Sequence, residues 1–282
     1  MLRNTFKTYV LLAGLGGFLV VVGQVLGGGG GATIGLILGF VMVGGSYWFS
    51  DKLAIAASRA QLVDEAEAPQ LHRIVRELTT QAGMPMPRLY VTPDAQPNAF
   101  ATGRNPRHAA VACTQGILQA LDESELRGVL AHELSHVRHR DILIGSVAAA
   151  IAMGITFAAR MAMWGAMFGG GGDDDDDRPN PIAILALALL APVAAMVIQM
   201  AISRSREFEA DRSAAELLGT GEPLARALEK LQAAAQRVPM DVNPAQASAY
   251  IVNPLSGRKV NFAGLFSTHP PAEERIARLR AY

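Results

Sequence analysis

Residues 129–141 read VLAHELSHVRHRD and contain three of the six histidines of the chain. His132 and His136 are four residues apart, so on a helix they lie on one face, about one turn apart. Asp122, followed three residues later by Glu125, forms a capping-box pattern, which predicts a helix that begins near Asp122 and carries both histidines. An apolar run follows directly, and we expect the helix to continue into it.

Two imidazoles at this spacing can hold one tetrahedral zinc ion. Glu133 follows the first histidine and can accept a proton from a water molecule that the metal activates. HELSH therefore matches H-E-x-x-H, the pattern of zinc metallopeptidases. The longer metzincin pattern does not fit, because it needs glycine and histidine where this chain has His139 and Ile142.

The residues leave the third protein ligand open. His139 shares the helix face with the second histidine of the motif. A second source is SRSREFEAD at 203–211, where Glu207 and Asp211 are four residues apart. One of these carboxylates can bind the metal while the other orients a ligating histidine. Spacing alone does not decide between Glu207 and Glu209.

The composition is that of a membrane protein. Half of the 282 residues are hydrophobic, 18% are charged and the mean hydropathy is +0.23. The formal net charge is zero, which excludes the basic footprint expected for nucleic-acid binding. Cys113 is the single cysteine, so an intrachain disulfide is impossible, and a buried strand position suits it best.

Four apolar segments have the length that a bilayer core requires, at 8–26, 32–49, 142–168 and 181–202. The glycines at 27–31 suit a tight turn between the first two segments. Basic residues flank the outer ends of both pairs, whereas the glycine run and the Gly/Asp-rich loop at 169–180 carry almost none. Both termini and the polar parts are therefore predicted to be cytoplasmic.

Two polar regions, 51–141 and 203–282, form the predicted cytoplasmic domain. The first contains a helical pattern over 58–82, which Pro69 interrupts or restarts, and strand-like runs at 88–91 and 109–113. The second is mostly helical. The expected fold is mainly α: four transmembrane helices and an α+β domain with a small sheet.

HELSH, a hydrophobic hairpin, SRSREFEAD and STHPPAEERI together resemble the HtpX family of bacterial membrane zinc peptidases, relatives of the type I CAAX prenyl endopeptidases. The resemblance covers essentially the whole chain, although Ser135 stands where the family often has glycine. It implies a gluzincin-type domain with one zinc ion, held by His132, His136 and Glu207. It also implies that Asp211 supports the metal ligands from behind.

Further roles follow from the same resemblance. Asn98, Ala99 and Phe100 match a strand beside the active site, where an extended substrate would add by β-pairing. His269 matches a histidine that stabilises the oxyanion, with Arg275 as its support. Glu133 is the general base.

The resemblance implies a zinc metalloendopeptidase of the bacterial inner membrane with a cytoplasmic active site. Its substrates would be membrane or unfolded proteins, cleaved in quality control under stress, with cooperation from other membrane proteases. A rival interpretation is a membrane scaffold with structural zinc. Such a site needs a fourth ligand, His139 or Glu209, and leaves Glu133 without a role.

Overall fold

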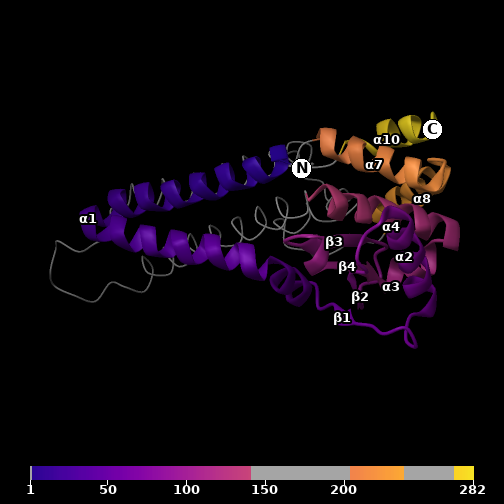
Figure 1. Cartoon of the computed structure of the whole chain (residues 1–282), viewed down its shortest axis with the longest axis horizontal. Helices are drawn as coiled ribbons and strands as arrows, with labels where there is room; N and C mark the ends of the chain where they lie inside the picture. Colours follow the sequence, from indigo (N-terminus) through magenta and orange to yellow (C-terminus); the bar gives the residue numbers. More distant parts are fainter. Residues whose placement is uncertain (1, 141–203, 238–269) are drawn as a thin grey trace.

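The structure is a computed structural model that describes residues 2–140, 204–237 and 270–282. Figure 1 shows a long helical hairpin, α1 (Leu2–Ala57), which extends away from a block made of a small sheet and the remaining helices. The predicted segments at 142–168, 169–180 and 181–202 lie outside the described residues. The prediction of a mainly helical fold with a small sheet is confirmed.

Helix α1 reverses direction at its glycine run. Gly28 has a φ of 58°, a left-handed conformation that glycine adopts without steric cost. Further along, Gly35 is buried where the two arms meet, and a Cβ placed there would lie 3.2 Å from Val20 Cα. The helical backbone continues through the glycine run, so the expected turn between two separate helices is a bend within one helical element.

The predicted spans at 8–26 and 32–49 both fall within α1. Many of its large apolar side chains point outward, and Phe40, for example, is 82% exposed. Across the described residues, no helix combines enough length and apolarity to cross a membrane.

A four-stranded mixed sheet lies at the base of the hairpin. Its strands are β1 (Gln61–Leu62), β2 (Arg88–Thr92), β3 (Ala99–Gly103) and β4 (Ala109–Thr114), in the order β1-β2-β4-β3. β2 and β4 run parallel, whereas β1 and β3 pair antiparallel with their neighbours. β3 therefore forms one edge of the sheet within the described part of the chain. The predicted strands at 88–91 and 109–113 are confirmed.

The two faces of the sheet pack against different parts of the chain. Leu89, Val111 and Cys113 face the main core, which helices described below complete. Phe100 and Ala112 face the other way and pack against the last turns of α1. This alternation follows from the two-residue period of a strand, and it fixes the base of the hairpin on the sheet.

Helix α2 (Pro69–Ala82) is shorter than the helical pattern indicated. Residues 61 and 62 pair with β2 as β1, so the prediction of a helix from 58 is wrong for 58–68. Pro69 favours a helix start, because a backbone N–H at the first helical position would have no acceptor within the helix, so proline loses no hydrogen bond there. Gly83, in the left-handed conformation, ends the helix.

Helix α4 (Glu123–His139) begins as the sequence predicted. The Asp122 side chain accepts the backbone N–H of Glu125, and the Glu125 side chain accepts that of Asp122. Its end differs from the prediction that the helix continues into the apolar run. Arg140 takes a left-handed conformation with a φ of 58°, and its backbone N–H closes on the carbonyls of His136 and Val137. This closure stops the helix before residue 142.

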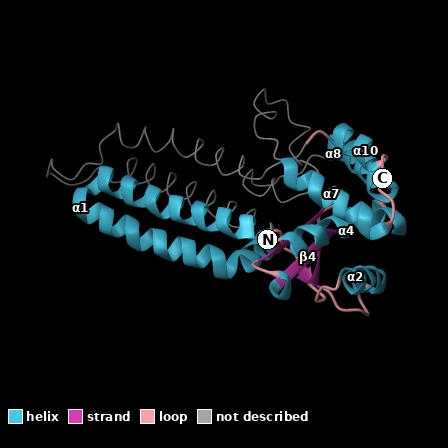
Figure 2. Cartoon of the chain, turned by 45° about the horizontal axis from the view of Figure 1, so that its top comes forward, coloured by secondary structure: helices cyan, strands magenta, loops and turns pink. Residues whose placement is uncertain are grey.

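The remaining described elements complete the core around α4. They are the short helices η1 (Pro106–His108) and α3 (Gln115–Ala120), and the longer helices α7 (Arg204–Leu218), α8 (Glu222–Arg237) and α10 (Ala272–Leu279). Figure 2 shows α7, α8 and α10 gathered at the end of the molecule opposite the hairpin bend. Helix α4 lies between the sheet and these helices, so most of its surface is buried.

Candidate metal centre and active site

Helix α4 presents the H-E-x-x-H residues to the interior. His132 and Glu133 are 1% and 4% exposed, and His136 is half-buried. The apolar residues Val129, Leu130 and Leu134 anchor the same helix in the core. The polar motif therefore sits on a rigid, well-packed element, which suits a site that must hold its geometry.

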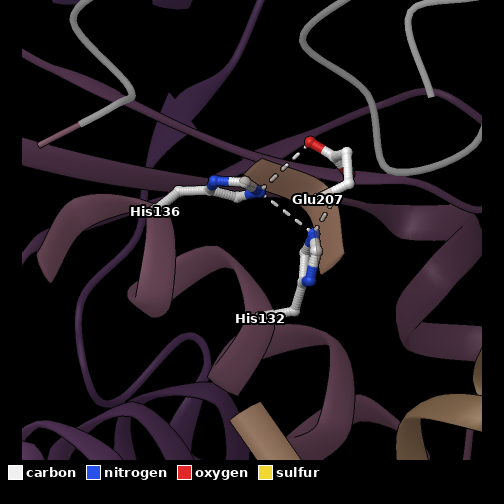
Figure 3. Close-up of side chains that lie close together, drawn as sticks. All are labelled: His132, His136 and Glu207. Carbon is white, nitrogen blue, oxygen red and sulfur yellow. Dashed lines mark hydrogen bonds and ion pairs between the residues drawn. The ribbon is translucent and has the colours of Figure 1, made fainter. Parts of the chain in front are cut away.

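Helix α7 brings Glu207 to the two histidines. Ligand atoms of these three residues all lie within 4.8 Å of one another. His136 Nε2 lies 3.1 Å from His132 Nε2 and 3.5 Å from Glu207 Oε1. Figure 3 shows the three side chains converging on one point. Two imidazole nitrogens and one carboxylate oxygen match the three-ligand donor set that catalytic zinc sites use.

The two rival ligands point elsewhere. Glu209 is exposed and makes an ion pair with Arg212 at 2.8 Å. His139 Nε2 lies 3.4 Å from the hydroxyl of Ser213 and is not part of the cluster. The structure thus favours Glu207, the residue that the resemblance implied, over both alternatives that the sequence left open.

Asp211 lies one turn after Glu207 and contacts the first histidine from behind. Its Oδ1 accepts the Nδ1–H of His132 at 2.9 Å, which turns His132 Nε2 toward the cluster. Burial alone would raise the pKa of Asp211, but the charge of Arg275 and hydrogen bonds from His132 and Arg275 lower it to about 2. Burial lowers the pKa of His132, which favours the neutral, metal-binding form of the ring.

Arg275 of α10 completes this buried network. It is 1% exposed and donates from Nε and Nη2 to the Asp211 carboxylate at 2.9 and 2.7 Å. Its Nη1 also lies 3.5 Å from Glu207 Oε2. Burial by itself would lower the pKa of Arg275, but the charges of Asp211 and Glu207 outweigh it and raise that pKa.

The family resemblance implies for Arg275 only a supporting role beside His269. His269 lies outside the described residues, and the contacts described for Arg275 are with Asp211, Glu207 and His132. A signal for this role was present in the sequence. Arg275 shares a helix face with Leu279, and a charge on an apolar helix face needs a buried partner.

Glu133 lies between the metal cluster and the edge strand. Burial raises the pKa of its carboxyl to about 8, an effect that nearby Glu207 strengthens, although His136 and a hydrogen bond from the backbone N–H of Ala101 oppose it. A carboxylate with a pKa near neutrality is suited to both accept and return a proton. The contact with Ala101 was not expected from the sequence, because it joins a strand and a helix 32 positions apart.

Of the three residues predicted to bind substrate, Asn98 directly precedes this edge strand, and Ala99 and Phe100 begin it. The backbone N–H of Thr114, the last residue of β4, donates to the carbonyl of Asn98, and the backbone N–H of Asn98 donates to the Thr114 hydroxyl, each at 2.9 Å. Because strand residues alternate, Ala99 and Ala101 turn their backbone groups to the opposite side, where Glu133 lies. Phe100 instead packs under the sheet against α1. The strand thus has an outward edge beside the proposed base.

Cys113 takes no part in this chemistry. It is fully buried in β4, and burial raises the pKa of its thiol to about 12. The expectation of a small buried strand residue is confirmed.

Fold and site together define a metallopeptidase: a buried H-E-x-x-H helix, a glutamate from a second helix and a strand edge beside the base. The family model for peptidase family M48 matches residues 65–282, and the chain belongs to this family. The prediction of a metalloprotease is thereby confirmed.

Individual relatives agree with this assignment. The chain is 54% identical over 279 residues to a protein named Protease HtpX homolog from Pelotomaculum thermopropionicum, covering 99% of both chains. It is 55% identical over 277 residues to a protein of the same name from Syntrophotalea carbinolica, covering 98% of both. The resemblance to the HtpX family is therefore confirmed.

A solved structure shares the fold. The crystal structure of Ste24p from S. mikatae matches with a TM-score of 0.53 and 18% identity, over 99% of this chain. This chain spans 66% of the length of that protein. At this level of identity the comparison shows a common fold.

Proposed function

We propose that the protein is a zinc endopeptidase of the bacterial inner membrane that hydrolyses peptide bonds in membrane or unfolded proteins. The observation that carries this proposal is the convergence of His132, His136 and Glu207 beside the buried carboxyl of Glu133. Membership of peptidase family M48 supports the reaction class and implies a metal. The donor set fits one zinc ion per chain.

Zinc, when bound by the two histidines and Glu207, supplies a Lewis acid and lowers the pKa of a water molecule. Glu133 accepts the proton of the attacking water and then returns it to the leaving amine. Asp211 holds His132 in the tautomer that leaves Nε2 directed toward His136 and Glu207, where it would bind the metal. Arg275 neutralises the charge of Asp211, so that this carboxylate stays ionised in the interior.

The edge strand β3 suits an extended substrate. Asn98 directly precedes the strand, Ala99 and Phe100 begin it, and its outward edge lies beside Glu133. A peptide that adds to this edge would bring a backbone carbonyl close to the proposed base. His269 is proposed to stabilise the oxyanion, as the family resemblance implies.

Membrane placement is the second part of the proposal. The outward-facing apolar residues of α1 support it, as does the fold shared with Ste24p. The proposed topology has four membrane segments, at 8–26, 32–49, 142–168 and 181–202, with both termini and the active site cytoplasmic. Such a site can reach loops of membrane proteins, in quality control alone or with other membrane proteases.

The test compares wild type with Glu133→Gln, both purified in detergent, freed of metal and then given zinc. Both should bind about one zinc ion, whereas the variant should cleave casein roughly 10²- to 10⁴-fold more slowly because it lacks the base. Glu209→Gln is the matched control on α7 and should keep both zinc and activity. Glu207→Gln should lose zinc.

The rival hypothesis, a membrane scaffold with structural zinc, predicts a different result. Every variant that binds zinc would fail to hydrolyse casein, and replacing His139 or Glu209 would cause loss of zinc. Equal cleavage by wild type and Glu133→Gln would also remove Glu133 from the proposed role.

A further inference from the structure

An open cavity of about 610 Å³ lies where the last turns of α1 meet the sheet, away from the metal cluster. Four cationic side chains line it, and they come from three separate segments of the chain. They are Lys52, Arg88, Arg104 and Arg107, joined by the exposed aromatic rings of Trp48 and Phe49. Asp51 is the single carboxylate in the lining.

Among the lysine, arginine and aspartate side chains of this lining, positive charge exceeds negative charge by three. Asp51 forms an ion pair with Arg88 at 2.6 Å, so it neutralises that arginine. Within the described part of the chain, neither Lys52 nor Arg107 lies within ion-pair distance of an acidic group. Arg104 donates to the backbone carbonyl of Trp48 at 3.4 Å, a contact that leaves its charge uncompensated. A concave surface with this charge favours an anion.

The aromatic residues indicate which kind of anion. Arg104 stacks over the Trp48 ring, with 5.2 Å from its guanidinium carbon to the ring centroid, and Lys52 lies 5.5 Å from the centroid of Phe49. Both rings end the outward-facing apolar stretch of α1 that includes Phe40. The cavity therefore has a cationic wall at the end of an exposed apolar helix. This arrangement matches an amphiphile with an anionic head and apolar tails.

We propose that this cavity, the headgroup pocket, binds the phosphate group of an anionic phospholipid whose acyl chains lie along α1. Arginine is suited to this ligand because its planar guanidinium binds phosphate oxygens in pairs. Tryptophan at the rim is typical of the interface between lipid and water. The pocket is separate from the metal centre, so its test measures binding and is independent of hydrolysis.

The experiment uses the full chain, delipidated in a non-ionic detergent, and follows its thermal unfolding midpoint during ligand titration. Four probes separate the possible sources of the anion: short-chain phosphatidylglycerol, phosphatidylcholine of the same chain length, inorganic phosphate and an oligo-aspartate peptide. The test variant is Lys52→Ala/Arg107→Ala. The control variant, Arg73→Ala/Arg226→Ala, removes the same charge from exposed residues on α2 and α8.

Phosphatidylglycerol should raise the midpoint of wild type and control, with an apparent affinity about 10- to 30-fold weaker in the test variant. Lys52→Arg/Arg107→Lys, which keeps both charges, should restore binding. Equal responses to the two lipids, or an unchanged affinity in the test variant, would overturn the proposal. So would tighter binding of inorganic phosphate or oligo-aspartate than of phosphatidylglycerol, since either result assigns the pocket to another ligand.

Discussion

Helices α1 and α4 distribute polarity in opposite ways. On α1, Ile34 and Phe40 are 60% and 82% exposed, whereas on α4 the charged and polar residues His132 and Glu133 are buried. His132 is tolerated in the interior because Asp211 of α7 accepts its Nδ1–H, and Arg275 of α10 in turn holds the Asp211 carboxylate. The exposed apolar side chains of α1 are instead proposed to face lipid. A polar group is stable in the interior when other side chains of the protein pair with it, whereas an exposed apolar side chain is stable only in a suitable external medium.

The largest effect is expected from breaking the charged interior. Arg275→Met removes the cation that faces two buried carboxylates, Asp211 and Glu207. Leaving those charges uncompensated should lower the free energy of unfolding by about 3–5 kcal/mol. Denaturant unfolding of metal-free protein in detergent measures this. Arg73→Met is the control, because the Arg73–Glu123 pair is solvent-exposed and its loss should not shift the midpoint measurably. Equal shifts in both variants would contradict the proposed difference between the buried ion pairs of Arg275 and the exposed pair of Arg73.

The next effect concerns the buried carboxyl of Glu133 in metal-free protein. Its pKa rises from 4.5 to about 8 in the folded state. Protonated Glu133 therefore contributes fully to the free energy of unfolding below about pH 4.5, and this contribution is lost as the pH rises through about 8. Glu133→Gln does not titrate, so it should be more stable than wild type at pH 8.5, by on the order of a few kcal/mol.

The difference between Glu133→Gln and wild type should shrink steadily toward pH 4.5. Thermal unfolding of chelator-treated protein across this range measures it. A difference that stays constant with pH would show that ionisation of Glu133 is not its cause.

A smaller effect tests how the apolar helix is held together. Gly35→Ala places a methyl group against the backbone of the opposite arm, and this overpacking should cost about 1–3 kcal/mol. Gly44→Ala is the matched control, because nothing lies within 4 Å of its Cβ position. Alanine also favours helix over glycine, so the control should be neutral or slightly stabilising. If both variants destabilise alike in detergent, the close contact between the arms is not the reason.

The smallest effect is expected at the surface end of α4. Asp122→Ala removes one half of the capping box while leaving the buried histidines in place. The unfolding midpoint should fall by about 2–4 °C, with zinc affinity unchanged. Ser124→Ala serves as the control, because Ser124 is not one of the two residues that form the capping box. A loss of zinc in Asp122→Ala would show that the cap also positions the site.

Much of the fold and site was predictable from short-range patterns. The four-residue spacing of His132 and His136, the capping box at Asp122 and the strand at 109–113 each depend on neighbours a few residues away. The sequence resemblance added Glu207 and Asp211 to that list. The structure brings both to His132, as it implied.

The tertiary structure decided what these patterns could not. Glu207 and Glu209 are equivalent by spacing, but the face of α7 that meets α4 buries one and exposes the other. The end of α4 at His139 interrupts an apolar continuation that the sequence favoured, because Arg140 closes the last turn. Arg275 contacts His132 across 143 positions. Local rules act over about one helical turn, whereas burial and charge pairing depend on which distant segments the packed core brings together.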